Sequence, residues 1–248
     1  MRALQRLTFT YFKLYLREPL AFFFTLAFPA LLLLLFGAIF GNEPDPEYNP
    51  ELGYIDFYTP ALIVLIAATV GLMSVPIKTA AERESKVLRR YRATPLRPLT
   101  YLSADVLVNI LVVLVGTALL VVIGKILYNL QLPQNWGGVL VVVVLAGLVF
   151  AAMGYLIASL APTARSAQVV GMVAFFPMMF LSGAAMPLEM FPGWLQGVSR
   201  MLPMTHAVKL AQGVWFGGGF SEYATETAIL GILLLVCTAF AARFFRWE

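Results

Sequence analysis

The sequence predicts an all-α integral membrane protein with six transmembrane helices. Hydrophobic residues fill 60% of the 248 positions and charged residues only 12%, whereas soluble domains carry about 25% charged residues. Six apolar runs approach the length of about 20 residues that a helix needs to cross a bilayer. These runs lie at roughly 19–41, 57–78, 101–124, 137–160, 166–186 and 225–245.

A basic amphipathic segment, residues 1–18, precedes the first run. Helical periodicity separates an apolar face from a basic face, with Leu4, Leu7, Tyr11, Leu14 and Tyr15 on the first and Arg2, Arg6, Lys13 and Arg17 on the second. We expect an interfacial helix that meets the bilayer at Pro19; the alternative is an ordinary positive flank. The first run is longer than the 7–15 residues of a signal-peptide core, so we expect a retained anchor.

The positions of Lys and Arg predict the orientation. Residues 1–18 hold four basic residues and residues 78–100 hold seven, and Arg165, Arg243 and Arg246 lie on the same side. Residues 42–56 contain five acidic residues and no Lys or Arg. Because basic residues concentrate in cytoplasmic segments, both termini are predicted to be cytoplasmic.

The fourth run is rich in valine, which would favour a strand in a soluble protein. In lipid a single spanning segment must satisfy its own backbone hydrogen bonds, so we expect a helix. Gly147, Ala151, Gly154 and Ala158 align on one face of it. Small residues in such a stripe allow another helix to approach closely.

The segment between the fifth and sixth runs is interrupted by proline and glycine, and no spanning run exists from Pro187 to Gly219. Two short helices, about 188–201 and 204–216, that re-enter the outer half of the membrane fit this pattern. An ordinary external loop with interfacial helices fits it nearly as well. Trp194 and Trp215 suit the outer interface.

Several function classes are disfavoured. The nucleotide-binding pattern G-x-x-x-x-G-K-[ST] is missing, because Gly124-Lys125 is followed by isoleucine. The predicted spans are nearly free of the charges that ion-coupled pumps use. One histidine, His206, and one cysteine, Cys237, offer neither a metal cluster nor an intrachain disulfide. We therefore expect no catalytic residues, no metal, no cofactor bound by this chain and no nucleic-acid partner.

The longest polar stretch, "AAERESKVLRRYRATPLRP", covers residues 80–98 between the second and third runs. Glu82 and Lys86 are four residues apart, which supports a short helix, and Pro95 and Pro98 would end it. The mixed charges favour a docking surface for a soluble partner over a purely electrostatic contact with lipid.

Two stretches carry a resemblance to a known family. "ERESKVLRRYRATPL" resembles the loop signature of type 2 ATP-binding-cassette transporter permeases, a group that includes drug and daunorubicin-type exporters. "FLSGAAMPLEMFPGWLQGVSRMLPMTH" is similar to the same family's motif between the fifth and sixth helices. The resemblance covers essentially the whole chain. The sequence departs from the commonest pattern at Lys86-Val87, where many members have Gly-Thr, and at His206, where an aromatic residue is frequent.

The resemblance implies an interfacial helix at 1–18 and a transmembrane domain at 19–248, with re-entrant external helices at 188–216. It also implies a cytoplasmic coupling helix at about 80–93, seated on a separate ATPase subunit that binds ATP and Mg. Two permease copies, or this chain and a close paralogue, would work with two ATPase subunits in the inner membrane of a prokaryote. The residues expected to couple to the ATPase are Glu82, Arg83, Glu84, Leu88, Arg89, Arg92, Thr94 and Pro95.

The cargo is predicted to be a hydrophobic or amphiphilic compound, moved by alternating access. Flexible methionines and aromatic rings suit varied apolar ligands, although such side chains more often face lipid or other helices. The pathway candidates are Phe24, Phe28, Met172, Phe175, Phe176 and Met179. The alternatives are a permease for a lipid-linked polysaccharide or other polymer, and a membrane anchor subunit that transports nothing.

Overall fold

The structure is a computed structural model that describes residues 2–15, 19–44, 52–87, 98–185, 188 and 191–244. These residues form helices and contain no strand. Six helices among them are long and apolar enough to cross a membrane, which confirms the predicted number of spans. They are Phe23–Phe40, Tyr54–Glu84, Leu102–Tyr128, Trp136–Leu160, Ala164–Leu181 and Ala224–Phe244.

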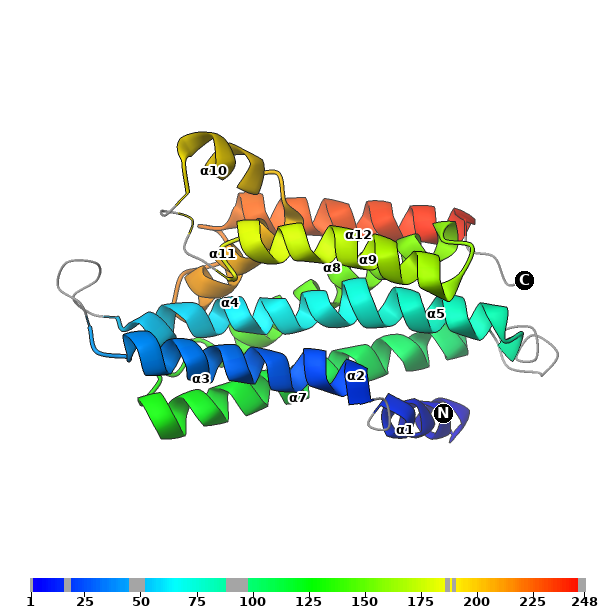
Figure 1. Cartoon of the computed structure of the whole chain (residues 1–248), viewed down its shortest axis with the longest axis horizontal. Coiled ribbons are helices and arrows are strands. Elements are labelled where there is room, and N and C mark those ends of the chain that lie inside the picture. The colour runs from blue at the N-terminus through cyan, green and yellow to red at the C-terminus, as the bar shows by residue number, and fades with distance from the viewer. Residues whose placement is uncertain are drawn as a thin grey trace.

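The spans run along the long axis of the molecule (Figure 1). The first is α2 (Pro19–Phe22), η1 (Phe23–Ala27) and α3 (Phe28–Phe40), and the second is α4 (Tyr54–Thr69), η2 (Val70–Ser74) and α5 (Val75–Glu84). The others are α7 (Pro98–Tyr128), α8 (Trp136–Leu160), α9 (Ala164–Leu181) and α12 (Ala224–Phe244). The helix α1 (Arg2–Tyr15) lies at the end of the bundle where α5 and α12 finish.

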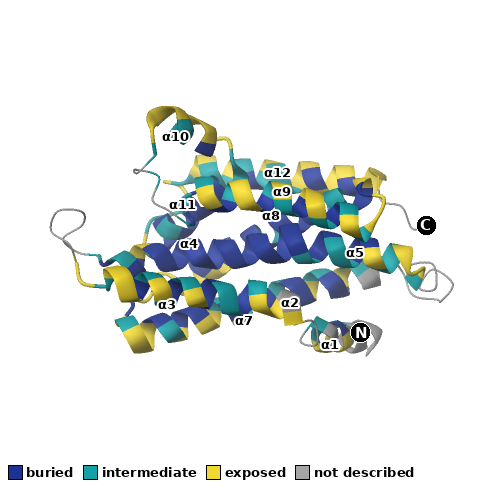
Figure 2. Ribbon diagram, in the orientation of Figure 1, coloured by how far each residue is buried: buried dark blue, intermediate teal, exposed yellow. Residues whose placement is uncertain are grey.

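The second span, Tyr54–Glu84, forms the centre of the bundle. Every residue from Tyr58 to Thr69 is buried, and Figure 2 shows this helix as an almost continuous buried strip. It packs against α3, α7, α8 and α9. The sixth span lies at the periphery and exposes apolar side chains such as Ile232, Leu235 and Phe240. In a membrane such a peripheral face meets lipid without cost, since lipid tails are as apolar as leucine.

The first and second spans each contain one wide helical turn. The Phe28 N–H donates to the carbonyl of Phe23, and the Val75 N–H donates to the carbonyl of Val70, each five residues earlier. A proline, Pro29 or Pro76, follows directly in both cases. Proline has no N–H and its ring clashes with the carbonyl four residues before it, so the local widening accommodates the proline without breaking the helix.

Glycines allow α8 and α9 to touch the backbone of η2. A Cβ atom built on Gly154 would lie 2.0 Å from the carbonyl oxygen of Gly71, and one built on Gly171 would lie 2.3 Å from the carbonyl oxygen of Leu72. The close approach predicted for the stripe on α8 is confirmed at Gly154. Gly147 differs, because a Cβ there would meet nothing within 4 Å.

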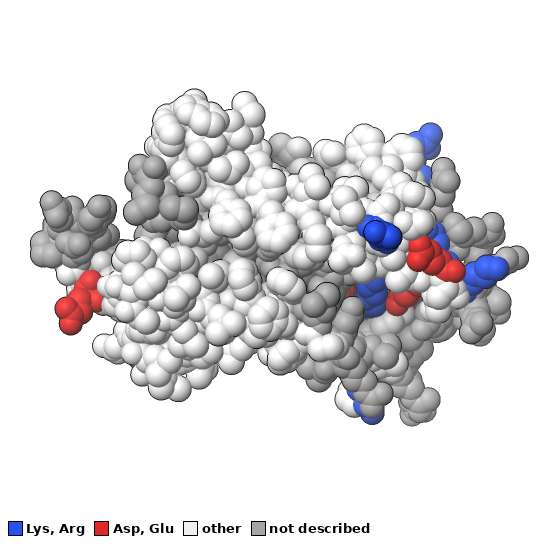
Figure 3. Space-filling model, viewed as in Figure 1, with Lys and Arg blue, Asp and Glu red and all other residues white. Residues whose placement is uncertain are grey.

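Charged residues distinguish the two ends of the bundle. We call the end with α1 and the last turn of α5 the basic end and the other the far end; Figure 3 shows Lys and Arg gathered with acidic residues at the basic end. The described basic residues placed there by their helices are Lys13, Lys78, Arg83, Lys86, Arg165 and Arg243. Lys125, Arg200 and Lys209 lie toward the far end.

A buried carboxylate organises the far end. Asp56, which is 2% exposed, lies in the first turn of α4 and accepts hydrogen bonds from the backbone N–H of Gln131 at 2.7 Å and of Gly53 at 3.2 Å. The side-chain amide of Asn42 donates to it at 3.1 Å. The same amide also donates to the Tyr128 carbonyl at 3.0 Å. These bonds tie the far ends of the first three spans together.

The segment between the fifth and sixth spans contains α10 (Gly193–Ser199) and α11 (Pro203–Trp215), close to the two predicted short helices. Trp194 is 73% exposed and Trp215 is buried against neighbouring helices. The expectation that both lie at the outer interface stays a prediction. The Trp215 indole donates to the Gln131 carbonyl at 3.1 Å, because a buried indole N–H needs a partner. The depth of these helices in the membrane stays a prediction.

The amphipathic N-terminal helix α1 packs against α7. Tyr11 is buried and Tyr15 half-buried, whereas Lys13 and Phe9 are exposed. The apolar face therefore meets the bundle through these two tyrosines. The predicted boundary between the interfacial helix and the transmembrane domain lies outside the described residues, which resume at Pro19. Its interfacial position stays a prediction.

Candidate functional site

The last turn of α5 holds the connection between α8 and α9. Arg83 donates from Nη1 to the carbonyl of Ala158 at 2.9 Å and from Nη2 to the carbonyl of Ala161. The next residue, Glu84, accepts a hydrogen bond from the backbone N–H of Ala164 at 2.9 Å. Two adjacent side chains of the second span thus reach both sides of one turn, almost 80 residues further along the chain.

The charges of this pair match the helix ends that they contact. The last carbonyls of a helix lack intrahelical partners and carry partial negative charge, and the first N–H groups carry partial positive charge. Arg83 therefore complements the end of α8, and Glu84 complements the start of α9. A surface charge near a helix end contributes about 0.3–1 kcal/mol. Glu84 is exposed and Arg83 is half-buried. Solvent screening therefore keeps the contribution of the Glu84 charge small.

The α8–α9 turn is also fixed by its own side chains. The Ser166 N–H donates to Thr163 Oγ1 at 3.1 Å, and the Thr163 N–H donates to Ser166 Oγ at 3.0 Å. This reciprocal pair satisfies two otherwise unpartnered donors at the start of α9. Pro162, Thr163 and Arg165 remain exposed. The basic end thus presents a short turn with a well-defined conformation.

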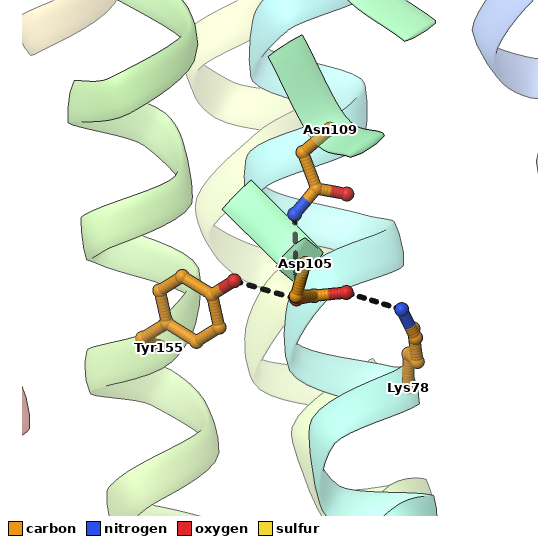
Figure 4. Close-up of polar contacts among 4 residues, drawn as sticks. All are labelled: Lys78, Asp105, Asn109 and Tyr155. Atoms are coloured by element: carbon orange, nitrogen blue, oxygen red, sulfur yellow. Dashed lines mark hydrogen bonds and ion pairs between the residues drawn. The ribbon is translucent and has the colours of Figure 1, made fainter. Parts of the chain in front are cut away.

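A buried polar junction lies deeper at the same end (Figure 4). Asp105 of α7, 1% exposed, forms an ion pair with Lys78 of α5. The Tyr155 hydroxyl of α8 donates to Asp105 Oδ2 at 2.5 Å, and the Asn109 amide donates to the same oxygen at 3.5 Å. The Lys78 ammonium also lies 4.0 Å from the centre of the Tyr11 ring. Side chains of α5, α7 and α8 therefore meet at one carboxylate, and α1 joins them through the contact between Tyr11 and Lys78.

The junction is strong only while it is complete. An isolated buried carboxylate costs several kcal/mol, which an ion pair repays when its remaining lone pairs are also satisfied. Lys78 and Tyr155 supply these partners from two different spans. A cation over an aromatic ring adds about 0.5–1 kcal/mol where solvent still reaches it. The relative positions of these helices are thus linked to one set of polar contacts.

The predicted coupling residues are only partly described. Glu82 is half-buried on α5, and Arg83 and Glu84 have the contacts given above. The predicted helix over 80–93 differs from the structure at its start, because residues 80–84 continue the second span and a turn follows at Ser85 and Lys86, with Lys86 at φ 57°. The remaining predicted residues lie outside the described part of the chain: Leu88, Arg89, Arg92, Thr94 and Pro95.

The chain matches the family described as "ABC-2 family transporter protein" over residues 42–243, which is most of its length. It belongs to this family. The assignment agrees with the resemblance found in the sequence and makes the chain a transport permease subunit.

Curated relatives of this ABC-2 permease have names that indicate transport. It is 28% identical over 169 residues to the probable multidrug ABC transporter permease YbhR of Escherichia coli, covering 68% of this chain and 46% of the relative. It is 25% identical over 228 residues to the daunorubicin resistance ABC transporter permease protein DrrB1 of Streptomyces coeruleorubidus, covering 88% and 77%. The chain spans about half the length of YbhR.

The six substrate-pathway candidates of this ABC-2 permease fall into two groups on either side of the second span. Phe24 and Phe28 lie in the first span, half-buried, with ring centres 6.0 Å apart. In α9, Phe175 and Met179 are buried, Met172 is half-buried and Phe176 is 40% exposed. Their role in transport stays a prediction, and the buried pair contacts neighbouring helices in this conformation.

Sequence reasoning missed the junction around Asp105. The sequence places Lys78 among the seven basic residues of 78–100 and assigns no role to Asp105. The signal available was the charge of each residue beside an apolar run, since an intramembrane charge usually has a partner. Nothing in the sequence pairs Lys78 with Asp105 or Tyr155, because the partners come from different spans.

Proposed function

We propose that this ABC-2 permease is the membrane subunit of an ATP-driven exporter of hydrophobic or amphiphilic compounds. The names of two relatives, which contain "multidrug" and "daunorubicin resistance", support this class of cargo. The 248 residues lack the G-x-x-x-x-G-K-[ST] pattern. A separate ATPase subunit would therefore supply the energy.

The proposed orientation places the basic end in the cytoplasm. Lys and Arg are enriched in the cytoplasmic segments of membrane proteins, and the described residues at this end include Lys13, Lys86, Arg165 and Arg243. The ATPase would then meet the bundle at the turn that follows α5. The far end, with Glu43 exposed, would face the outside.

One observation carries the coupling proposal: the second span is continuous from the far end to the basic end. Its 31 residues extend about 46 Å, which exceeds the hydrocarbon core of about 30 Å. The helix therefore projects beyond the membrane while its middle packs in the core of the bundle. A force on its cytoplasmic end would reach α3, α7, α8 and α9, which all pack against it.

A second copy of the chain completes the proposed exporter, with one ATPase for each permease. The two groups of pathway candidates lie on opposite flanks of the second span, and both include side chains that are not fully buried, such as Phe24 and Phe176. Two copies facing each other would enclose such side chains in a shared pathway. We expect native mass measurement of the purified complex to give two permeases and two ATPases; a monomeric permease that still exports would contradict this.

The direct test is reconstitution with candidate ABC ATPase subunits that are co-expressed with this chain. We expect the two proteins to purify together, and daunorubicin to stimulate ATP hydrolysis in lipid discs. The matched control is the same complex with the phosphate-binding lysine of the ATPase replaced. Failure to co-purify, or hydrolysis that none of a panel of amphiphilic compounds changes, would contradict the proposed function.

A further inference from the structure

The contacts of Arg83 and Glu84 give these residues a role different from direct docking on a partner. Both terminal nitrogens of the Arg83 guanidinium are used by the carbonyls of Ala158 and Ala161. One carboxylate oxygen of Glu84 is used by the Ala164 N–H. A partner protein that displaced these contacts would have to break three hydrogen bonds within the permease.

The helices α5, α8 and α9 also contact one another further from the basic end. Ala80 of α5, Ala161 of the turn and Ala167 of α9 are buried against one another. About 18 Å before Arg83 along the second span, the carbonyls of Gly71 and Leu72 pack on Gly154 and Gly171. Small residues at both levels leave little room for the helices to slide. Contacts at two separated heights resist rotation as well as separation.

We propose that Arg83 and Glu84 are positioning residues that fix the α8–α9 turn to the end of the second span, so that α5, α8 and α9 move as one body during transport. The inference rests on the proposed function, since the movement is the one that the ATPase drives. The ATPase-facing surface then begins at Ser85 and Lys86, both exposed. When the ATPase displaces this end of α5, Arg83 and Glu84 transmit the displacement to α8 and α9.

Charge and chemistry select these two residues for this role. A guanidinium reaches two carbonyls at once through its planar fork, which a lysine ammonium does not reproduce. A carboxylate or amide oxygen is needed to accept from the Ala164 N–H. Glu84→Gln therefore keeps the contact without the charge, whereas Glu84→Ala removes it.

A covalent link in place of the hydrogen bonds tests the proposal. In a Cys237→Ala background, cysteines at two exposed positions outside the proposed ATPase-facing surface, Ala81→Cys and Arg165→Cys, are joined by a short bifunctional maleimide in the assembled complex with the ATPase. Export of daunorubicin and ATP hydrolysis are then measured in vesicles. The single-cysteine variants treated with the same reagent are the controls.

We expect Glu84→Ala to retain the ATPase but to lower the daunorubicin exported per ATP by about fivefold or more, and Glu84→Gln to stay close to the parent. The cross-link should leave the parent active and restore Glu84→Ala. The proposal is wrong if the cross-link blocks export by the parent, if it fails to restore Glu84→Ala, or if Glu84→Ala releases the ATPase. A parent chain that does not bind the ATPase at all would instead refute the proposed function.

Discussion

The two ends of the bundle each bury one aspartate, and they satisfy its carboxylate in different ways. Asp56 at the far end accepts from the neutral N–H groups of Gly53, Gln131 and Asn42. Asp105 at the basic end binds the charged Lys78 and the Tyr155 hydroxyl. The partners of Asp56 lie in short connections between helices, whereas those of Asp105 are long side chains on separate spans.

The contacts of Asp56 hold the far end in a fixed arrangement, whereas those of Asp105 at the basic end can adjust. A backbone donor next to a helix end has little freedom, so the far end is held in one arrangement. Lysine and tyrosine side chains can follow a helix that shifts, and they keep a contact that backbone groups would lose. We infer that the far end stays closed as a unit, while the basic end would take up the movements of the proposed ATPase partner.

The largest expected effect comes from breaking the ion pair on the side of the cation. Lys78→Met leaves Asp105, 1% exposed, as a buried carboxylate without its counter-charge, at a cost of about 3 kcal/mol of stability. Asp105→Leu should cost less, because the Lys78 side chain is 30% exposed and can reach water. Thermal unfolding of the purified variants measures both. Equal losses, or a larger loss for Asp105→Leu, would contradict this assignment.

At the far end, Asp56→Ala removes the acceptor of three N–H donors, and we expect a loss of about 2 kcal/mol. Asp56→Asn keeps one acceptor oxygen and should lose less. Transport assays test directly whether the far end stays fixed. Folded Asp56→Asn should export the same amount of compound per ATP as the parent. A changed ratio would show that the far end also moves.

Between the two ends, glycine spacing on α8 offers a matched pair of variants. Gly154→Ala places a Cβ against the Gly71 carbonyl oxygen and should cost about 1–2 kcal/mol. Gly147→Ala makes the same chemical change on the same helix where a Cβ meets nothing within 4 Å. It should be neutral or stabilise slightly. Similar melting temperatures for the two variants would refute the close approach of α8 and η2.

The smallest predicted effect concerns the turn at the basic end. Thr163→Ala removes the side-chain acceptor for the Ser166 N–H, and loss of such a cap costs about 1 kcal/mol. Thr163→Ser retains the hydroxyl and is the control. Hydrogen exchange at the first turn of α9 should increase in the alanine variant alone, and equal protection in both variants would rule out the capping role.

The sequence predicts the spans well and the polar contacts poorly, for a physical reason. A run such as 137–160 has to satisfy its backbone within itself, so its helix is a local property and is found at Trp136–Leu160. The second apolar run is predicted to end at about 78, where the polar stretch that contains Glu82 to Glu84 begins. The helix continues to Glu84, and the α8–α9 turn, distant in sequence, supplies partners for Arg83 and Glu84.

The wide turns and the burial of Trp215 show the same limit. Proline inside a span favours a local irregularity, but the sequence does not show whether Pro29 and Pro76 lead to a kink or to the wide turns found here. Trp215 was expected at an interface because tryptophan favours such positions. When buried, its indole N–H needs an acceptor, and the Gln131 carbonyl supplies one from a connection that is distant in sequence.

The central claim is that the basic end, with its turn after α5, faces the cytoplasm and the ATPase. Impermeant maleimide labelling of intact cells tests it most directly, with single cysteines at Glu43 and Ser85, both exposed, in a Cys237→Ala background. We predict that Glu43→Cys reacts in intact cells and that Ser85→Cys reacts only after the membrane is permeabilised. Labelling of Ser85→Cys but not Glu43→Cys in intact cells would invert the orientation and contradict the account.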